Sequence, residues 1–261
     1  MGYNRTMGKG VTFSNFRDMG GLELPSGGVI KAGKLYRTCK LRPKNGDDKR
    51  FLASLGLDCV IDFRIPEEVK EKPDKLPKGV EYVNASVFGD TKFRILAPTR
   101  KSCFAMLSCT DAQFDEIMDG VRDAYEYMPY AKHAYSELFS RMNEGKTIAF
   151  HCTAGKDRTG VAAMIIELAL GRTRRQALDE YMRSNNRKTG KTARLMKLVK
   201  PLRLSDKFYE CVRYNSRVHE ELFDRAWNAI FDKYATIEDF LLAEYGVTAE
   251  NIADWKRYYT E

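Results

Sequence analysis

Apolar and polar segments alternate along the first third of the chain in a way that predicts strands and helices in turn. The stretch LDCVIDFRIPEEV, residues 57–69, combines a buried-type strand with a helix that starts at Pro66. VEYVNA, residues 80–85, is typical of the next strand. A strand, a helix and a strand in this order favour an α/β sheet with parallel members. Upstream, Gly27 and Gly28 separate two strand-like stretches, which predicts a hairpin.

The middle of the chain carries helical stripes. Thr110 and Gln113 form a capping box, and apolar residues then recur on one helical face as far as Pro129. A second stripe covers residues 135–142. Such stripes most often face a core. The alternative is a helical insertion, or lid, over an active site at about residues 91–142.

The C-terminal part predicts more helices, with capping residues at Thr173, Thr236 and Thr248. No repeat, low-complexity segment or linker rich in glycine, proline or serine divides the chain. We therefore expect one domain over residues 1–261. Its class is α/β, with a mostly parallel central sheet flanked by helices, a helical insertion and a helical C-terminal part.

The segment TIAFHCTAGKDRTGVAAMIIELAL, residues 147–170, places a cysteine, two basic residues and an acid between two apolar stretches. Residues 148–150 predict a short buried strand, and residues 161–170 are apolar almost all round, as in a helix through a core. A helix that begins near Arg158 directs unpaired backbone N–H groups and the positive end of its dipole into the loop before it. This loop is therefore predicted to bind phosphate.

Cys152 lies at the floor of the loop, where the helix N-terminus and Arg158 favour the thiolate. A free thiol has a pKa near 8.5, which such surroundings lower to about 3.5–7.5. The guanidinium of Arg158 is a planar fork that matches two phosphoryl oxygens. The pattern His-Cys-x5-Arg-Thr between a strand and a helix favours a nucleophile over a structural cysteine. A nucleotide P-loop is excluded, because Phe150 and Asp157 stand where it needs glycine and a hydroxyl residue.

Composition narrows the choice of partners. Forty-four Lys and Arg against 36 Asp and Glu give a net charge of +8, which favours anionic partners. No basic motif interleaved with aromatic residues supports nucleic-acid binding.

The six cysteines form no Cys-x-x-Cys pair, and His133, His151 and His219 lack the spacing of metal ligands, so we expect no metal and no cofactor. Without a membrane-spanning run or a visible secretory signal, a cytoplasmic location is expected; the alternative is secretion with the signal removed.

HCTAGKDRTG, residues 151–160, resembles the active-site loop of cysteine-based protein tyrosine phosphatases. The whole chain resembles their bacterial branch, which includes secreted tyrosine and phosphoinositide phosphatases of pathogens. Individually weaker motifs resemble that branch in the same order: NFRDMGG (15–21), LYRT (35–38), VIDFRIPEEV (60–69), YMRSN (181–185) and EYGVT (244–248). A tyrosine-phosphatase-like fold is the implied architecture.

The resemblance implies a reaction in two steps. Cys152 attacks phosphorus, a phosphocysteine forms, and water hydrolyses it without a metal. Thr159 is expected to hydrogen-bond the sulfur, and His151 to support the loop from behind. The residues expected to hold the phosphate are Thr153, Ala154, Gly155, Lys156, Asp157 and Arg158.

A general acid has to protonate the leaving group. Many tyrosine phosphatases carry it on a mobile Trp-Pro-Asp loop, which is absent because neither Trp227 nor Trp255 precedes Pro-Asp. The bacterial branch is thought to use an aspartate at the position of Asp157, which is the first candidate. Its pKa would have to be raised for it to donate at neutral pH. Asp62 and Asp90 are the reserve candidates for the general acid.

A structural role is at least as good an interpretation for part of the VIDFRIPEEV motif. In that interpretation Asp62 supports the site, and Arg64 and Glu67 form buried ion pairs.

The expected substrate is phosphotyrosine, with phosphoserine, phosphothreonine and phosphoinositides as open alternatives. Lys156 adds a charge that suits lipids with several phosphates. The acid-free basic run 187–203 could approach an anionic membrane, although a solvated helix face is its usual explanation. Two further classes stay open: a rhodanese-type sulfur carrier and a phosphate-binding module without turnover.

Overall fold

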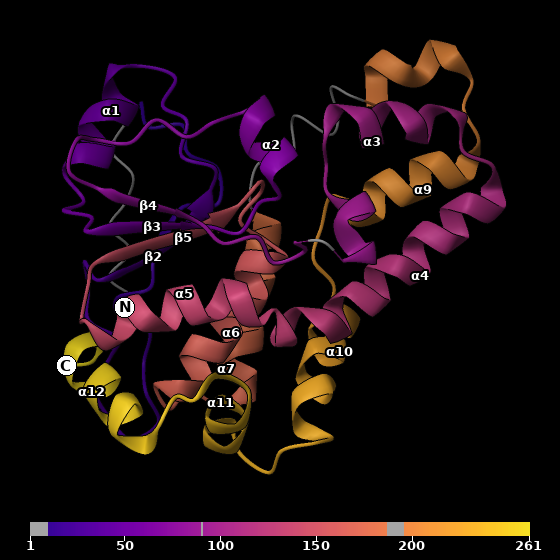
Figure 1. The fold of residues 1–261 in the computed structure, drawn as a ribbon. Coiled ribbons are helices and arrows are strands. Elements are labelled where there is room, and N and C mark those ends of the chain that lie inside the picture. The colour runs from indigo at the N-terminus through magenta and orange to yellow at the C-terminus, as the bar shows by residue number, and fades with distance from the viewer. Residues whose placement is uncertain (1–9, 90, 187–195) are drawn as a thin grey trace.

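Five strands form the central sheet of the computed structural model, which describes residues 10–89, 91–186 and 196–261 (Figure 1). The strand order is β1-β2-β5-β3-β4; β1 pairs antiparallel with β2, and the other pairs are parallel. The predicted α/β class with a mostly parallel sheet is therefore confirmed. The strands are β1 (Arg17–Asp18), β2 (Leu35–Cys39), β3 (Cys59–Asp62), β4 (Glu81–Asn84) and β5 (Ile148–Cys152).

Helices cover both faces of the sheet. On one face, α5 (Lys132–Asn143) packs against β3 and β5, and α6 (Arg158–Ala169) against β2 and β5. On the other face, Leu52 of α1 (Gly46–Ala53) joins a small apolar cluster with Val60 and Ala149 of the sheet. Further helices are α2 (Pro66–Glu71), α7 (Arg174–Met182), α10 (Glu220–Phe231), α11 (Ile237–Tyr245) and α12 (Ala249–Tyr259).

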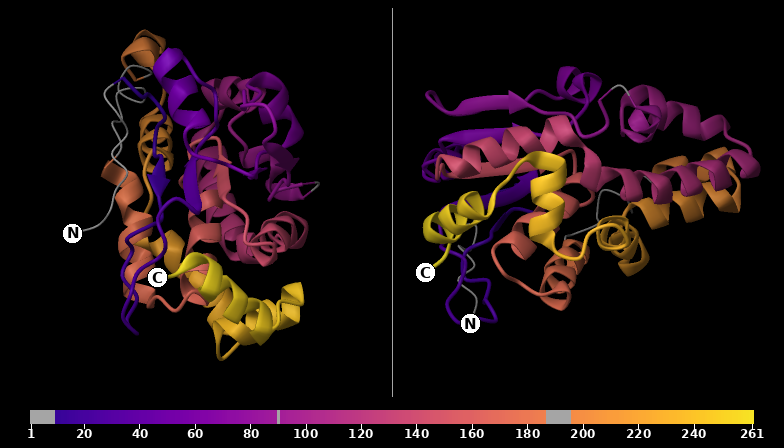
Figure 2. Two further views of the ribbon diagram at one scale, coloured as in Figure 1. Left: turned by 90° about the vertical axis from the view of Figure 1, so that its left-hand side faces the viewer. Right: turned by 60° about the horizontal axis from the view of Figure 1, so that its bottom comes forward.

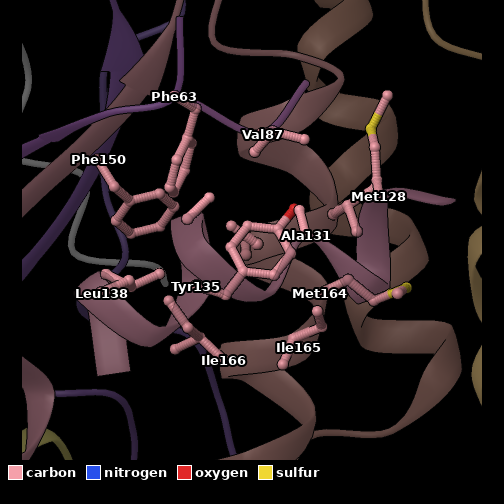
Figure 3. Packing of buried hydrophobic residues seen from close by; sticks show 14 of the residues in the cluster. Phe63, Val87, Met128, Ala131, Tyr135, Leu138, Phe150, Met164, Ile165 and Ile166 are labelled. Atoms are coloured by element: carbon pink, nitrogen blue, oxygen red, sulfur yellow. The ribbon is translucent and has the colours of Figure 1, made fainter. Parts of the chain in front are cut away.

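The main core fixes the position of α6. Every residue of this helix is buried, as its nearly uniform apolar sequence predicts. Tyr135 of α5 packs between the sheet and α6, with its ring edge-on to Phe63 at 5.6 Å and Ile165 and Ile166 close by (Figure 3). Because α6 is packed on all sides, the end of the loop that joins β5 to α6 is held in a fixed position.

A helical extension reaches away from the sheet (Figures 1 and 2). It comprises η1 (Lys92–Leu96), α3 (Arg100–Ala105), η2 (Met106–Ser108), α4 (Asp111–Tyr127) and α9 (Asp206–Asn215). The segment 91–142, for which a helical insertion was the alternative to helices packed on the core, thus divides into two parts. Residues 92–127 belong to the extension, whereas α5 lies on the sheet as part of the core.

Two sequence interpretations need adjustment. The expected hairpin at Gly27 and Gly28 is a turn with a single antiparallel bridge, between Glu23 and Val29, instead of two full strands. Helices α9 and α10 were not singled out by any pattern. The predicted C-terminal helices α7, α11 and α12 are confirmed, with Thr173, Thr236 and Thr248 as their N-caps. Within the described ranges, we find no helix with the length and apolar character that crossing a bilayer requires.

Candidate active site

The loop from Cys152 to Arg158 joins the end of β5 to the first turn of α6. Gly155 has a φ of +69°, in the left-handed region that favours glycine. A Cβ atom at this position would stand 2.2 Å from the carbonyl oxygen of Thr38 on β2. The loop is therefore packed tightly against the neighbouring strand, and only glycine fits at its centre.

Side chains from the N-terminal region hold the outside of this loop. The amide of Asn15 donates to the carbonyl of Gly155 at 2.5 Å and to that of Ala154 at 3.3 Å. Arg37 donates to the Gly155 carbonyl as well, at 3.2 Å. In a trans peptide the N–H points opposite to the C=O. The N–H groups of Gly155 and Lys156 therefore face the inside of the loop, as an anion site requires.

A buried ion network orients these tethers. Nε of Arg17 lies 2.6 Å from the Glu180 carboxylate on α7. Nη1 of Arg17 donates to the side-chain oxygen of Asn15 at 2.6 Å. Arg37 lies 3.8 Å from the same Glu180 carboxylate. Sequence reasoning assigned no role to these residues. The available signal was the pair of motifs NFRDMGG and LYRT, which contain Asn15, Arg17 and Arg37.

Cys152 is buried at the carboxyl end of the central strand, where it lies opposite Cys39 in the β2–β5 register. Burial alone would raise the pKa of its thiol. The Arg158 guanidinium, together with the nearby hydroxyl and backbone N–H dipoles of Thr159, outweighs both burial and the charge of Asp157, so the pKa lies below its ordinary value. The environment thus favours the thiolate.

Arg158 is fixed by a carboxylate that sequence reasoning missed. Its two terminal nitrogens donate to the two oxygens of Glu68 at 2.7 and 2.9 Å, and its guanidinium lies 5.2 Å from the ring centre of Phe88. Thr153 donates its hydroxyl to the same carboxylate. The interpretation that Glu67 forms a buried pair was wrong: Glu67 is exposed and pairs with Arg94, because successive residues of a helix point in different directions and Glu68 is the one that faces the loop.

The amino-acid sequence matches a known protein family over almost the whole chain. Residues 11–261 match the tyrosine phosphatase family. The chain belongs to this family.

Curated relatives agree with this assignment. A Cupriavidus necator protein named as a tyrosine-protein phosphatase is 35% identical over 178 residues, which cover 67% of this chain and 62% of that protein. The triple specificity protein phosphatase PtpB of Mycobacterium tuberculosis is 24% identical over 201 residues, 71% of each chain. A tyrosine-protein phosphatase of Nostoc commune is 27% identical over 147 residues, 54% of this chain and 45% of the relative. The chain thus spans less than two thirds of the length of the first relative.

Asp157 is the N-terminal cap of α6 and its side chain is 28% exposed. One carboxylate oxygen accepts from the Tyr125 hydroxyl at 2.6 Å and from Lys156 Nζ at 2.6 Å. Burial raises the pKa of Asp157, but Lys156, Tyr125 and Arg158 outweigh it, so the pKa lies below its ordinary value. The raised pKa that an acid role would need is therefore not present in the free protein.

Tyr125 belongs to a pair of buried tyrosines. Its hydroxyl lies 2.9 Å from that of Tyr181 on α7, so the two hydroxyls and the carboxylate of Asp157 form one hydrogen-bonded chain. Tyr125 lies on the apolar helical face that the sequence predicts between Thr110 and Pro129, and the bond of its hydroxyl to Asp157 adds a second role that periodicity does not reveal.

Lys156 is buried and does not extend freely toward a ligand. Its Nζ contacts Asp157 and donates to the carbonyl of Arg217 at 3.1 Å, in the segment between α9 and α10. The loop is thereby tied to the helical extension.

His151 lies behind the loop, in the position expected of a supporting residue. Its Nε2 is 2.7 Å from Asp74, and Nδ1 is 3.7 Å from Asp62. Burial lowers the pKa of His151, but the two carboxylates outweigh burial and raise it to about 9. The ring is therefore protonated at neutral pH.

Asp62 is also part of this network. It is fully buried and accepts from Arg64 at 2.7 to 3.0 Å and from the Tyr82 hydroxyl at 2.7 Å. Burial raises its pKa, and His151 and Arg64 more than offset this, which lowers it to about 2. A carboxyl so strongly ionised and so far behind the loop does not fit the reserve role of general acid. Asp90, the other reserve candidate, lies outside the described residues.

The spacing of the histidines in the sequence does not predict that His151 lies beside two carboxylates. Asp62, Asp74 and His151 bring potential ligand atoms within 4.8 Å of one another. However, the histidine carries a proton and Arg64 binds both carboxylates. These groups fit an ion network better than a metal site, because a metal needs a deprotonated ring nitrogen.

Proposed function

We propose that this chain hydrolyses phosphotyrosine in proteins through a phosphocysteine intermediate. The observation that carries the proposal is the position of Cys152 at the end of β5 beside the Arg158 guanidinium, which lowers the pKa of the thiol and which Glu68 holds in place. The names of the relatives support the same activity.

In the first step the Cys152 sulfur attacks phosphorus, the S–P bond forms and the P–O bond to the tyrosyl oxygen breaks. Arg158 and the inward N–H groups of the loop stabilise the phosphoryl oxygens. In the second step water attacks phosphorus, the S–P bond breaks, and the thiolate leaves with help from the Thr159 hydroxyl. Inorganic phosphate is the product.

Asp157 is the proposed acid in the first step and base in the second. Its pKa is low in the free protein, but a bound phosphate dianion is a like charge that works to raise it. The proton then goes to the leaving tyrosyl oxygen, and water returns a proton to the carboxylate in the second step.

Three variants test the mechanism. Cys152→Ser is expected to abolish release of phosphate from p-nitrophenyl phosphate and from phosphotyrosyl peptides, whereas the control Cys103→Ser, at an exposed cysteine of α3, is expected to keep it. Mass spectrometry of acid-quenched wild type during turnover is expected to find phosphate on the peptide that contains Cys152. Asp157→Asn should lower kcat strongly for poor leaving groups and weakly for an activated aryl phosphate.

The proposal fails if Cys152→Ser stays active or if no phosphoenzyme forms. Phosphate binding without turnover in the wild type would identify a binding module, and transfer of sulfur to cyanide would identify a rhodanese-type carrier. Equal losses on both classes of leaving group would remove Asp157 from the acid role.

Phosphoinositides at an anionic membrane are a second candidate, favoured by the surface of the helical extension. Phe104 of α3 is 70% exposed, one turn after Lys101, and Leu198 is 75% exposed between Lys197 and Lys200. Val199 packs in one cluster with Met106 and Leu107 of η2, which follows α3 directly, so the two segments are neighbours. Exposed apolar residues beside lysines suit an anionic interface.

Vesicles test this candidate. Sedimentation with anionic but not neutral vesicles, lost in Phe104→Ser/Leu198→Ser, would support it, as would phosphate release from phosphoinositides in those vesicles. The basic positions 187–195 of the expected run lie outside the described residues. No binding to anionic vesicles would leave proteins as the substrate class.

A further inference from the structure

A groove next to the catalytic loop has no part in the mechanism above. It lies between α4 and α9, which run side by side in the helical extension (Figure 1), and has a volume of about 660 Å³. Two contacts align these helices: Lys207 with Asp115 near their first turns, and Asn215 with Met118 further on.

One end of the groove adjoins the active site. Arg122 lines it, and Tyr125, three residues further along α4, donates to Asp157 in the catalytic loop. Arg217 lines the same end, and its carbonyl accepts from Lys156. Lys156 and Asp157 therefore both contact residues at or next to this end, which we call the inner end.

Positive charge gathers at the inner end. Arg213 and Arg217 are exposed there, and within the described part of the chain neither side chain forms an ion pair. Arg122 is paired with Asp119, and at the outer end Lys207 pairs with Asp115 and also lies near Glu210, the third acid of the lining. An anionic group is thus attracted to the inner end and not to the outer one.

The floor of the groove is apolar. Phe114, Met118 and Cys211 line it, and Tyr214 stacks on His219 with ring centres 3.9 Å apart at an angle of 8°. From Asp115 to Arg122 the groove follows α4 for about 10 Å, at 1.5 Å per residue. An extended peptide advances about 3.3 Å per residue, so about three residues fit.

We propose that this groove binds the peptide segment next to the phosphotyrosine, with an acidic side chain at Arg213 and Arg217 and an apolar side chain on the floor. An inositol headgroup is polar all round and would leave the apolar floor unused, which favours a peptide. The inference rests on the proposed phosphatase activity and names the class of protein substrate that this activity prefers.

Matched phosphotyrosyl peptides test the proposal. One peptide of each pair carries glutamate and then leucine beside the phosphotyrosine, and the other carries glutamine and serine; one pair has these residues before the phosphotyrosine and one pair after. We expect wild type to prefer the acidic and apolar peptide of one pair by about tenfold in kcat/KM, as a charge-assisted hydrogen bond in a partly exposed site allows.

The preference ratio is the kcat/KM of one peptide of a pair divided by that of the other, measured with the same variant. A change in the chemical step affects both peptides equally and therefore cancels in this ratio. In Arg213→Gln/Arg217→Gln the ratio is expected to fall toward 1, and Met118→Gln should lower only the part due to leucine. Arg50→Gln on α1 removes a comparably exposed arginine far from the groove and should keep the ratio.

A wild-type ratio near 1 for both pairs, or a ratio unchanged in the double variant, overturns the groove proposal. The groove proposal is also overturned if the double variant Arg213→Gln/Arg217→Gln loses activity on soluble inositol phosphates while its peptide ratio stays unchanged. That result would assign the two arginines to binding of a lipid headgroup. Absence of Cys152-dependent hydrolysis of p-nitrophenyl phosphate would instead refute the phosphatase activity itself.

Discussion

The carboxylate of Glu68 binds both terminal nitrogens of Arg158, at 2.7 and 2.9 Å, and both side chains are almost completely buried. A guanidinium with two planar bonds on one edge cannot rotate, so its free edge is held in one direction before substrate arrives. In the proposed reaction Glu68 would act on the phosphate through Arg158 and through Thr153, whose hydroxyl it also binds, and is therefore a positioning residue.

Glu68→Gln is expected to lower kcat/KM on the order of 10²-fold, because an amide can hold only one of the two guanidinium nitrogens and the Arg158 fork loses its fixed direction. The measurement is steady-state hydrolysis of p-nitrophenyl phosphate, with thermal melting to verify that the variant is folded. Glu67→Gln, which changes the neighbouring exposed residue, should stay within about twofold of wild type. A folded Glu68→Gln protein with wild-type kcat/KM would contradict the positioning role.

Tyr125→Phe is expected to move the alkaline limb of the pH–rate profile to higher pH. The lost hydroxyl stabilises the ionised form of Asp157, so its removal raises the pKa of that carboxyl and keeps it protonated further into the alkaline range. The profile of kcat/KM against pH checks this. Tyr127→Phe, on the same helix, is the control and should leave the limb in place. A purely structural role for Tyr125 predicts a lower rate with no shift.

His151→Asn is expected to lower stability most at acidic to neutral pH. The folded pKa of His151 is raised to about 9 from an ordinary value of 6.5, so its stabilising contribution is complete below pH 6.5 and disappears as pH rises through 9. Below pH 6.5 the difference between variant and wild type should be on the order of 3 kcal/mol. Urea unfolding at several pH values measures it. A difference that stays constant up to pH 9.5 would show that the ring is not charged in the folded protein.

Gly155→Ala is expected to abolish activity and to lower the melting temperature. The added methyl group would meet the Thr38 carbonyl at 2.2 Å, and the residue would also have to keep a φ of +69°. Gly171→Ala, with a φ of +99° and open space around the position, carries only the backbone strain of about 1–2 kcal/mol. Differential scanning calorimetry and phosphatase assays compare the two variants. Similar losses in both would mean that the close approach to Thr38 has no separate effect.

The centre of the site could be predicted from the sequence because its chemistry is contiguous. Cys152 and Arg158 lie in one strand–loop–helix segment, where spacing alone fixes that both face the same anion. The parallel sheet followed in the same way, from the order of apolar segments around Pro66.

The partners of that centre could not be predicted, because they depend on directions that a one-dimensional pattern does not contain. Glu67 and Glu68 are adjacent acids on the short helix α2, and nothing in its sequence indicates which one turns inward. The structure decides it: Glu68 also accepts from the backbone N–H of Ile65 at 3.2 Å, which draws its side chain toward the loop. Asn15 reaches the loop from a left-handed backbone position, with φ of 59°, which no periodicity reveals.

Helix α4 carries Arg122 and Tyr125 within a single turn, so any tilt or slide of this helix displaces both side chains together. A peptide anchored against the helix would therefore alter the strength of the hydroxyl bond to Asp157 and with it the affinity of that carboxylate for a proton. Thermodynamic reciprocity makes the effect symmetrical: protonation of Asp157 would change the affinity of the helix for the peptide by the same factor.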